Sequence, residues 1–475
     1  MNETELQQPP GEHAGQIITR RVRYLLEWRA LLRIAVPVVL AELGWMFMTI
    51  VDMVMVGSLG PTAIGAVGVG NAVFYAPALF GIGILLGLDT LVSQAWGRGD
   101  FDECHRSLAQ AVYIAAAYTP LCMAMVWAAT YWFTSWGVTP AVAGLSGQYL
   151  RMLNYSTLPL LLYAALRRYL QGVGRARAVT FALISANLFN WAGNWVLIYG
   201  RLGAPAMGVR GSALSTLIAR VYMTAVLLFA TWQHESRRGH PLFRRWAAPD
   251  LSRLRRLLAL GAPAATQIVL EVGAFGGATV LAGRLAPEAL AAHQIALNWA
   301  SITYMVPLGV SAAAAVSVGH AVGACDPARA RRAGWLAILT SIAFMAIAAV
   351  CFLVFPGRLV RVYTANAAVL QLGVPLLALA GAFQIFDGIQ GTATGALRGL
   401  GETRLPMYAN LVGYWAMGLP LGYVLCFTAG WGIYGLWIGL TLALILISLM
   451  ILLRWVTESR RIAAVPVPMP RDLAV

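Results

Sequence analysis

Runs of about twenty apolar residues recur along the whole chain, separated by short polar segments. Each run is long enough to cross the hydrocarbon core of a bilayer, about 30 Å, as an α-helix. Polar and apolar residues do not alternate at a period of two, so the pattern excludes a porin-type β-barrel. The chain is therefore predicted to be an all-α membrane protein with twelve spans, at about residues 31–56, 63–96, 107–133, 142–171, 176–199, 209–232, 257–283, 288–321, 332–356, 367–396, 404–427 and 433–455.

The hydrophobic pattern occurs twice. Residues 31–100 align with residues 257–326 without a gap, at a constant offset of 226, and this indicates a duplicated chain. Each half holds six spans, an even number, so the two halves have the same orientation. We expect two six-helix lobes related by a pseudo-two-fold axis along the membrane normal, with a cavity between them. The matches fall where backbone geometry is set: Pro37 with Pro263, Gly57 with Gly283, Pro61 with Pro287, Gly83 with Gly309, Gly97 with Gly323 and Asp100 with Asp326.

The polar segments divide the chain into five parts. The one long polar linker between spans falls between the repeats. The predicted parts are a cytoplasmic N-terminal tail at 1–30, an N-lobe at 31–232, a cytoplasmic inter-lobe linker at 233–256, a C-lobe at 257–455 and a cytoplasmic C-terminal tail at 456–475.

Composition supports the membrane assignment and sets its orientation. Hydrophobic residues make up 59% of the chain and charged residues only 11%. All 34 basic residues are arginine, and without a lysine neither a Walker A phosphate loop nor a pyridoxal imine can form. Assigning loops to alternate sides places 27 arginines on one side and 5 on the other. This bias predicts cytoplasmic termini and explains the net charge of +15 without nucleic-acid binding.

The acidic residues inside the predicted spans are the candidate functional residues. A carboxylate within a membrane-length apolar run is costly and is by default a functional hypothesis. Glu271 and Asp387 lie in the second half, with Gln267 one helical turn before Glu271 and Asn298 as a further neutral ligand. Such a pair suits alternating occupancy by H⁺, Na⁺ and a cationic substrate. The alternative is a pair of polar residues satisfied by serine, glutamine or backbone.

In the first half, Asp52 has potential partners. Asn190 and Asn194 are four residues apart and share a helical face, and Thr216 follows in the next span. A carboxylate with amide and hydroxyl oxygens is a plausible site for a hard cation or a proton. Alternatively, the amides only hold helices together. Arg220 is either a counter-ion for one of the acids or a residue that snorkels outward.

The cavity between the halves should be apolar and aromatic. Glu42 lies ten residues before Asp52, about 80° off alignment on a helix, so both can face one cavity. Pro37 interrupts the first span, and a bend there would couple protonation to movement of the helix; a fixed kink is the alternative. The rings available to stack on a cation are those of Trp45, Phe74, Tyr75, Trp299, Tyr304 and Phe383.

Several motifs, in order, resemble the multidrug and toxic compound extrusion (MATE) family, nearest its NorM-type branch. They are Ile50-Val51-Asp52-Met53-Val54-Met55-Val56-Gly57, Gln94-Ala95-Trp96-Gly97-Arg98-Gly99, Leu270-Glu271-Val272, His293-Gln294-Ile295-Ala296-Leu297-Asn298 and Asp387-Gly388-Ile389-Gln390 leading to Gly395-Ala396-Leu397-Arg398-Gly399. The resemblance covers about residues 30–455. It implies two six-helix lobes forming a V and export of cationic amphipathic compounds driven by inward Na⁺ or H⁺.

The resemblance also implies site residues. The family's acids of the first, seventh and tenth helices fall on Asp52, Glu271 and Asp387. Its fifth-helix polar pair and sixth-helix threonine fall on the residues already grouped with Asp52. The chain departs from some relatives, which have an acid at Asn194 or a tyrosine at Phe383, and each departure removes an oxygen. Either lobe can therefore hold the coupling ion.

We expect a monomeric secondary antiporter in a bacterial cytoplasmic membrane, not an enzyme. Its partners would be lipophilic cationic small molecules and membrane lipids, and it would need no cofactor besides Na⁺ or H⁺. That ion would bind at Glu271 and Asp387 or at Asp52, Asn190 and Asn194. The rival is a lipid-linked oligosaccharide flippase of the same superfamily. A flippase would have a basic central cavity for pyrophosphate, whereas the mid-membrane charges here are mainly acidic.

Overall fold

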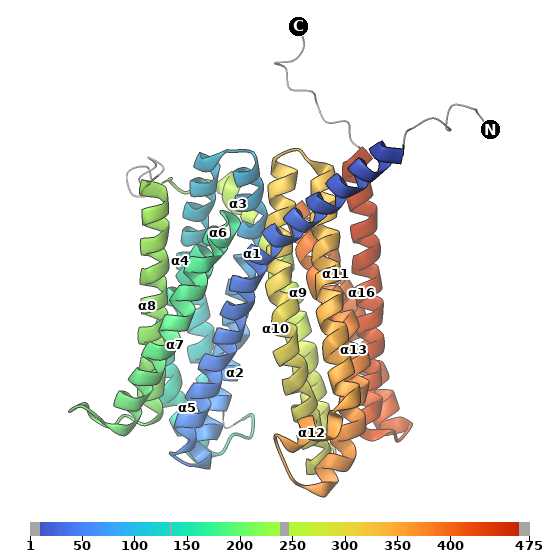
Figure 1. The fold of residues 1–475 in the computed structure, drawn as a ribbon. Coiled ribbons are helices and arrows are strands. Elements are labelled where there is room, and N and C mark those ends of the chain that lie inside the picture. The colour runs from blue at the N-terminus through green and yellow to red at the C-terminus, as the bar shows by residue number, and fades with distance from the viewer. Residues whose placement is uncertain (1–9, 134, 238–246, 465–475) are drawn as a thin grey trace.

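The computed structural model describes residues 10–133, 135–237 and 247–464. The described residues form helices joined by short loops, with no strand among them (Figure 1). The N-terminal half contains α1 (Pro10–Gly57), α2 (Pro61–Ile84), α3 (Gly87–Gly97), α4 (Phe101–Thr130), α5 (Pro140–Leu153), η2 (Asn154–Ser156), α6 (Thr157–Gly172), α7 (Ala176–Tyr199) and α8 (Val209–Ser236). The C-terminal half contains α9 (Leu251–Ala282), α10 (Pro287–Gly323), α11 (Pro327–Val354), α12 (Pro356–Arg361), α13 (Ala367–Leu400), α14 (Arg404–Asn410), η3 (Leu411–Gly418), α15 (Leu419–Tyr423), η4 (Val424–Thr428) and α16 (Gly432–Ala464).

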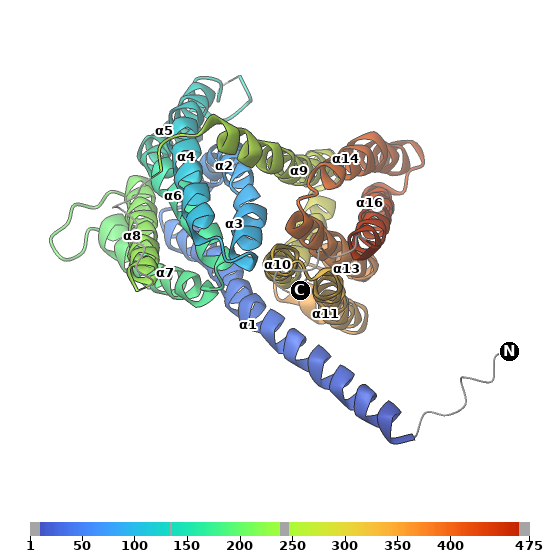
Figure 2. The same cartoon turned by 90° about the horizontal axis from the view of Figure 1, so that it is seen from above.

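The helices form two lobes that stand side by side (Figures 1 and 2). Eleven helical segments of the described residues are long and apolar enough to cross a membrane. The twelfth predicted span is α5–η2–α6, whose pieces are too short to count singly. Large apolar side chains such as Val54, Leu449 and Leu453 are exposed, as expected where lipid replaces water. The predicted all-α, two-lobe membrane fold is confirmed.

Three predicted spans are not continuous α-helices, and among them the eleventh span contains two π-helical segments, η3 and η4. The second divides into α2 and α3 at Leu85 and Leu86, and the fourth contains a 3₁₀ turn at η2. At η2, the Ser156 hydroxyl donates to the Leu153 carbonyl at 2.5 Å and the Thr157 hydroxyl to the Asn154 carbonyl at 2.7 Å. Side chains that bond nearby carbonyls compete with regular helix geometry. Apolar length alone does not reveal these breaks.

Helix α1 extends far beyond its predicted span and touches both lobes. It begins at Pro10, so the described part of the predicted tail is helical. Leu31 packs in the core of the C-lobe, and Glu27 forms an ion pair with Arg332 of α11 at 2.8 Å. The helix continues through Pro37 without a break, and the Pro37 carbonyl accepts a hydrogen bond from Thr180 at 2.5 Å. A hinge role for Pro37 stays a prediction, as does the cytoplasmic placement of both tails and the linker.

The contact between the lobes follows the repeat. A Cβ at Gly97 would overlap the carbonyl of His320, and one at Gly323 would overlap the carbonyl of Gln94. Because His320 is the repeat equivalent of Gln94 at the offset of 226, these contacts are images of each other. Only glycine permits such close approach of two helices. The lobes therefore meet along a pseudo-two-fold axis, at the ends of α3 and α10 that lie on the side where α1 begins and α16 ends (Figure 1).

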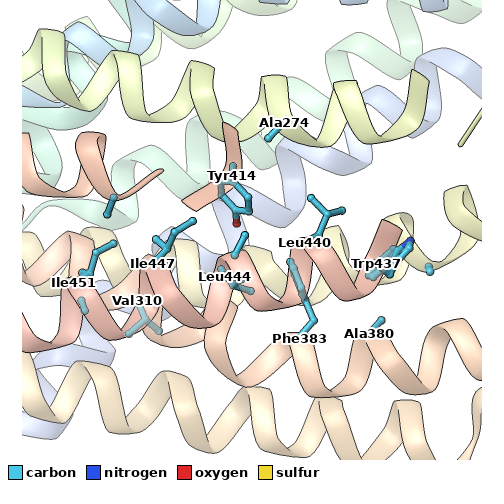
Figure 3. Close-up of a cluster of buried hydrophobic side chains, with 14 of the residues drawn as sticks. Ala274, Val310, Ala380, Phe383, Tyr414, Trp437, Leu440, Leu444, Ile447 and Ile451 are labelled. Atoms are coloured by element: carbon cyan, nitrogen blue, oxygen red, sulfur yellow. The ribbon is translucent and has the colours of Figure 1, made fainter. Parts of the chain in front are cut away.

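Each lobe has its own packed interior. In the C-lobe, α16 contributes Trp437 and a row of aliphatic side chains, and Phe383 and Tyr414 belong to the same cluster (Figure 3). The ring of Phe383 lies edge-on to that of Trp437, with centroids 5.9 Å apart. Lipid tails are as apolar as these side chains, so close van der Waals packing holds the lobe together. This packing fixes the positions of α9 and α13, which carry the acids.

Candidate functional site

A cavity of about 410 Å³ lies between the lobes, lined by α1, α2 and α6 of the N-lobe and by α9 and α10 of the C-lobe. Among the residues that the structure describes, its carboxylates are Glu42 and Glu271. Trp45 stacks on Tyr163 in its wall, with ring centroids 6.1 Å apart. The aromatic and apolar lining suits a flat amphipathic compound. The predicted site residues that the structure brings to this cavity are Glu42, Trp45, Tyr75, Glu271 and Tyr304.

A second cavity of about 260 Å³ lies inside the C-lobe and contains Asp387. Phe383 and Trp437 form part of its wall. Glu271 and Tyr304 line both cavities, so they form the partition between them. The structure thus places one acid where the inter-lobe cavity meets the inner cavity of the C-lobe.

One hydrogen bond of Glu271 comes from a residue that sequence reasoning did not assign. The Gln390 amide donates to the Glu271 carboxylate at 3.1 Å and lies 3.4 Å from the Asn410 side-chain oxygen. The Tyr414 hydroxyl donates to the Gln390 side-chain oxygen at 3.5 Å. Gln390 follows Asp387 by three residues on α13, so helical spacing alone would have placed Gln390 on the same helical face as Asp387. It is a neutral partner that orients Glu271.

In the N-lobe, the predicted partners of Asp52 converge. Asp52 is 6% exposed, and the Asn194 amide donates to one of its oxygens at 2.6 Å. The Thr216 hydroxyl lies 3.2 Å from the other oxygen. The amide of Asn194 also lies 3.3 Å from the side-chain oxygen of Asn190. The carboxylate is therefore enclosed by neutral donors from α7 and α8.

The cluster around Asp52 has the donor atoms that a small hard cation requires. The side-chain oxygen of Asn194 is buried without a hydrogen-bond partner, as is the side-chain nitrogen of Asn190. A buried polar atom without a partner is costly, and a bound cation would satisfy the oxygen. Among the residues described, no three His, Cys, Asp or Glu side chains gather as ligands for a transition metal.

Arg220 neither snorkels outward nor pairs with an acid through its terminal nitrogens. It is 2% exposed, and these nitrogens donate to the Ser156 hydroxyl at 2.5 Å and the Tyr75 hydroxyl at 3.0 Å. Its guanidinium lies over the ring of Phe74, 4.8 Å from the centroid. Phe74 therefore packs against Arg220 inside the N-lobe and does not line the inter-lobe cavity. Tyr75, in contrast, both holds Arg220 and lines the inter-lobe cavity.

Two arginines counted as loop residues lie in the cavity wall. Arg167 and Arg168 belong to α6 and line the inter-lobe cavity. Arg167 forms an ion pair with Glu42, and Arg168 lies 3.4 Å from Asp89. The wall of this cavity therefore holds two arginines beside its two carboxylates. The positive-inside count did not separate loop arginines from arginines in the last turns of a helix.

Two further candidates, Asn298 and Trp299, lie away from the cavities, whereas Gln267 forms a side-chain hydrogen bond with Glu271. Asn298 is exposed, and its amide donates to the Gln294 carbonyl of its own helix at 2.9 Å. The Trp299 indole donates to the Leu359 carbonyl at 3.2 Å inside the C-lobe. Gln267 is buried, one turn before Glu271. The structure therefore does not bring Asn298 or Trp299 to the cavities described.

The family model MatE matches residues 37–196 and 263–424. The two matched segments begin 226 residues apart, at the offset of the repeat.

The sequence is similar to that of curated bacterial proteins over nearly its whole length. A probable multidrug resistance protein NorM from Mesorhizobium japonicum is 36% identical, covering 91% of this chain and 94% of the relative. A multidrug resistance protein NorM from Burkholderia vietnamiensis is 35% identical, covering 91% and 95%.

Solved structures share the fold at lower identity. A eukaryotic MATE transporter superimposes with a TM-score of 0.78 at 21% identity, over 92% of this chain and 98% of that one. A MOP superfamily transporter from Pyrococcus furiosus gives 0.83 at 18% identity, over 92% and 97%. At such identity these likenesses bear on the fold alone.

Proposed function

The chain belongs to the MATE family, and from this premise we propose that it is a secondary antiporter that expels cationic amphipathic compounds in exchange for Na⁺ or H⁺. Its NorM relatives, at 32–36% identity, are multidrug resistance proteins, so its general activity is multidrug efflux. The family comprises transporters, which agrees with the expectation that the chain is not an enzyme.

The position of Glu271 carries the proposal. It lines both the inter-lobe cavity and the inner C-lobe cavity that contains Asp387. A lipophilic cation in the first cavity and a driving ion in the second would therefore compete for one carboxylate. Binding of the ion neutralises the acid and weakens its attraction for the drug, which is the coupling that antiport requires.

The lining supports a cationic substrate rather than an anionic one. Arg167 and Arg168 give the wall two positive charges, but Arg167 is paired with Glu42 and Arg168 lies beside Asp89. Glu271 receives a neutral amide instead, so no arginine compensates this carboxyl group. An oligosaccharide flippase would need uncompensated basic residues for a pyrophosphate. We therefore retain efflux of lipophilic cations as the proposed activity.

The coupling ion has two candidate sites with different donor sets. The C-lobe set, with Glu271 and Asp387, suits a proton or Na⁺ that exchanges directly with drug. The N-lobe set of Asp52, Asn190, Asn194 and Thr216 is rich in neutral oxygens and suits Na⁺. We propose that the protein works as a monomer in a bacterial cytoplasmic membrane, with both termini cytoplasmic.

Reconstitution in proteoliposomes tests the proposal. Efflux of a fluorescent lipophilic cation is measured with an imposed Na⁺ gradient at fixed pH, and separately with a pH gradient in the absence of Na⁺. We expect one gradient to drive efflux and its collapse to stop it. Efflux that ignores both gradients, or transport of a lipid-linked pyrophosphate in place of the dye, would overturn the proposal.

A further inference from the structure

A buried carboxylate joins the lobes at the end where α1 begins and α16 ends. Asp89, in the first turn of α3, is 1% exposed. It lies 3.1 Å from Nε of Arg398, on α13 of the C-lobe, and 3.4 Å from Nη1 of Arg168, on α6 of its own lobe. The Thr90 hydroxyl also donates to the Arg398 carbonyl at 2.5 Å. One acid is thus shared between an arginine of each lobe.

Two neutral hydrogen bonds flank this acid and cross the same interface. The Gln94 amide of the N-lobe donates to the Gly399 carbonyl at 3.0 Å. Nε2 of His320 in the C-lobe lies 2.6 Å from the Gly172 carbonyl and donates to it. Gln94 and His320 are repeat equivalents, and so are Gly172 and Gly399 at an offset of 227. The neutral bonds are therefore a symmetric pair.

The charged contact between Asp89 and Arg398 has no equivalent contact at the corresponding positions of the repeat. At the repeat offsets, Asp89 corresponds to Ala315 and Arg398 to Gln171. The symmetric pair accounts for the alignment of the lobes, so the charged group adds something else. A buried ion pair is weak evidence for stability, but breaking one by removing a partner is strongly unfavourable. A contact of this kind suits a two-state element better than a permanent one.

We propose that Asp89, Arg398 and Arg168 form a charged latch that closes the protein at the end where α1 begins and α16 ends and exchanges partners when this end opens. In the closed state, Asp89 binds Arg398 across the interface. When the lobes separate, Arg398, two residues before the end of α13, moves into water, and Arg168 keeps the charge of Asp89 compensated. The inference rests on the proposed function, because antiport requires this end to open.

The latch shares a residue with the substrate site. Arg168 lines the inter-lobe cavity while it approaches Asp89. Asp89 and Arg168 thereby acquire a role in gating, separate from the ion and drug binding assigned to Asp52, Glu271 and Asp387. Arg253 and Glu103 also pair across the lobes, at 2.9 Å, but next to the linker that joins them and partly exposed to water. That pair can persist during opening.

The test measures opening directly with a cysteine probe. Ser93 is fully buried and packs against Gly319 of the other lobe. Ser93→Cys is introduced in the full chain after the native cysteines have been replaced by serine or alanine. The rate of labelling by a hydrophilic maleimide is then measured in detergent solution, where the reagent reaches both ends of the protein. The labelling rate is proportional to the fraction of molecules that are open at this interface.

The expected effects have opposite signs. Arg398→Gln and Asp89→Asn weaken the closed state and should raise the labelling rate by about tenfold. Arg168→Gln removes the partner that the open state needs and should lower it. Arg454→Gln is the matched control, because Arg454 binds Glu402 and Glu458 within the C-lobe, and it should leave the rate unchanged. Unchanged labelling in Arg398→Gln, or an increase in Arg168→Gln, would overturn the latch.

Two more variants distinguish loss of the charged contact from loss of folding. Arg398→Lys keeps the positive charge and should restore most of the protection, and Gln94→Ala removes one neutral bond and should raise labelling by less than Arg398→Gln. Monodisperse elution and a cooperative thermal unfolding transition establish that each variant is folded. Labelling needs neither drug nor driving ion, so it tests the latch separately from dye efflux, whose failure would overturn the proposed function instead.

Discussion

The acids of the two lobes have different surroundings. In the N-lobe, both oxygens of Asp52 face neutral donors, from Asn194 at 2.6 Å and Thr216 at 3.2 Å. In the C-lobe, Glu271 receives the Gln390 amide at 3.1 Å and lies in the wall of two cavities. A fully ligated carboxylate can exchange little besides a small ion, whereas one that faces a cavity can also meet a drug. This difference favours the C-lobe as the place where the proposed competition between drug and ion occurs.

The repeat sharpens this contrast. Glu271 is the repeat equivalent of Trp45, and Asp387, at the offset of 227, of Leu160. Trp45 and Leu160 both line the inter-lobe cavity from the N-lobe. The C-lobe therefore has acids at two positions where the N-lobe has apolar side chains, and of these acids Glu271 lines the inter-lobe cavity and Asp387 the inner cavity of the C-lobe. The two repeats make symmetric backbone contacts. The side chains at equivalent positions differ, and this difference places the acids in the C-lobe.

The largest effect is expected at the C-lobe acids. Glu271→Gln and Asp387→Asn should each abolish cation-driven efflux, because a neutral amide cannot alternate between drug and ion. Dye efflux from proteoliposomes measures this. Glu288→Gln, an acid at the start of α10, is the matched control and should transport normally. Substantial efflux in both acid variants would remove the C-lobe from the coupling mechanism.

Asp52→Asn should have a smaller effect. The amide can occupy the same space among Asn190, Asn194 and Thr216, so the lobe should fold normally while ion binding weakens. We expect exchange to fall by about tenfold with little change in the affinity for a lipophilic cation in a binding assay. A loss of drug affinity as large as that of Glu271→Gln would contradict the division of labour between the lobes.

Gln390→Leu should have an intermediate effect. It removes the donor to Glu271 and leaves the carboxylate in place. The ion concentration for half-maximal efflux should shift by about fivefold, because a hydrogen bond to the acid is lost. A titration of efflux rate against Na⁺ and against pH measures the shift. An unchanged titration would show that Gln390 does not influence ion binding.

The smallest effect is expected for Thr216→Val. It deletes one hydroxyl contact to Asp52 and should change ion affinity by about threefold. Thr231→Val is the control, because the buried Thr231 hydroxyl lies further along α8 and donates to the Leu227 carbonyl of its own helix at 2.8 Å. Equal shifts in the two variants would mean that Thr216 acts only through the stability of α8.

The fold and the Asp52 cluster could be predicted because they depend on local or repeated patterns. Apolar length set the spans, the offset of 226 set the symmetry, and the spacing of Asn190 and Asn194 set a shared helical face. Isolated acids in apolar runs pointed to the C-lobe site in the same way. These patterns can be recognised in the sequence without knowledge of how the helices are arranged.

The remaining contacts depend on which helix faces which. Periodicity places Asn298 on a face of α10 but does not say that this face is exposed. Nothing local distinguishes Phe74, buried under Arg220, from Tyr75, which reaches the cavity. Arg168 carries the same signal as a loop arginine, although it lies in a cavity wall. Only the arrangement of the lobes resolves these cases.

The central claim is that drug and driving ion compete for Glu271. It is tested most directly by measuring the dissociation constant of a fluorescent lipophilic cation at increasing Na⁺ and at decreasing pH, in the parent protein and in Glu271→Gln. The account predicts that affinity falls as the driving ion increases in the parent and stays constant in the variant. The same dependence on the driving ion in both proteins would contradict it.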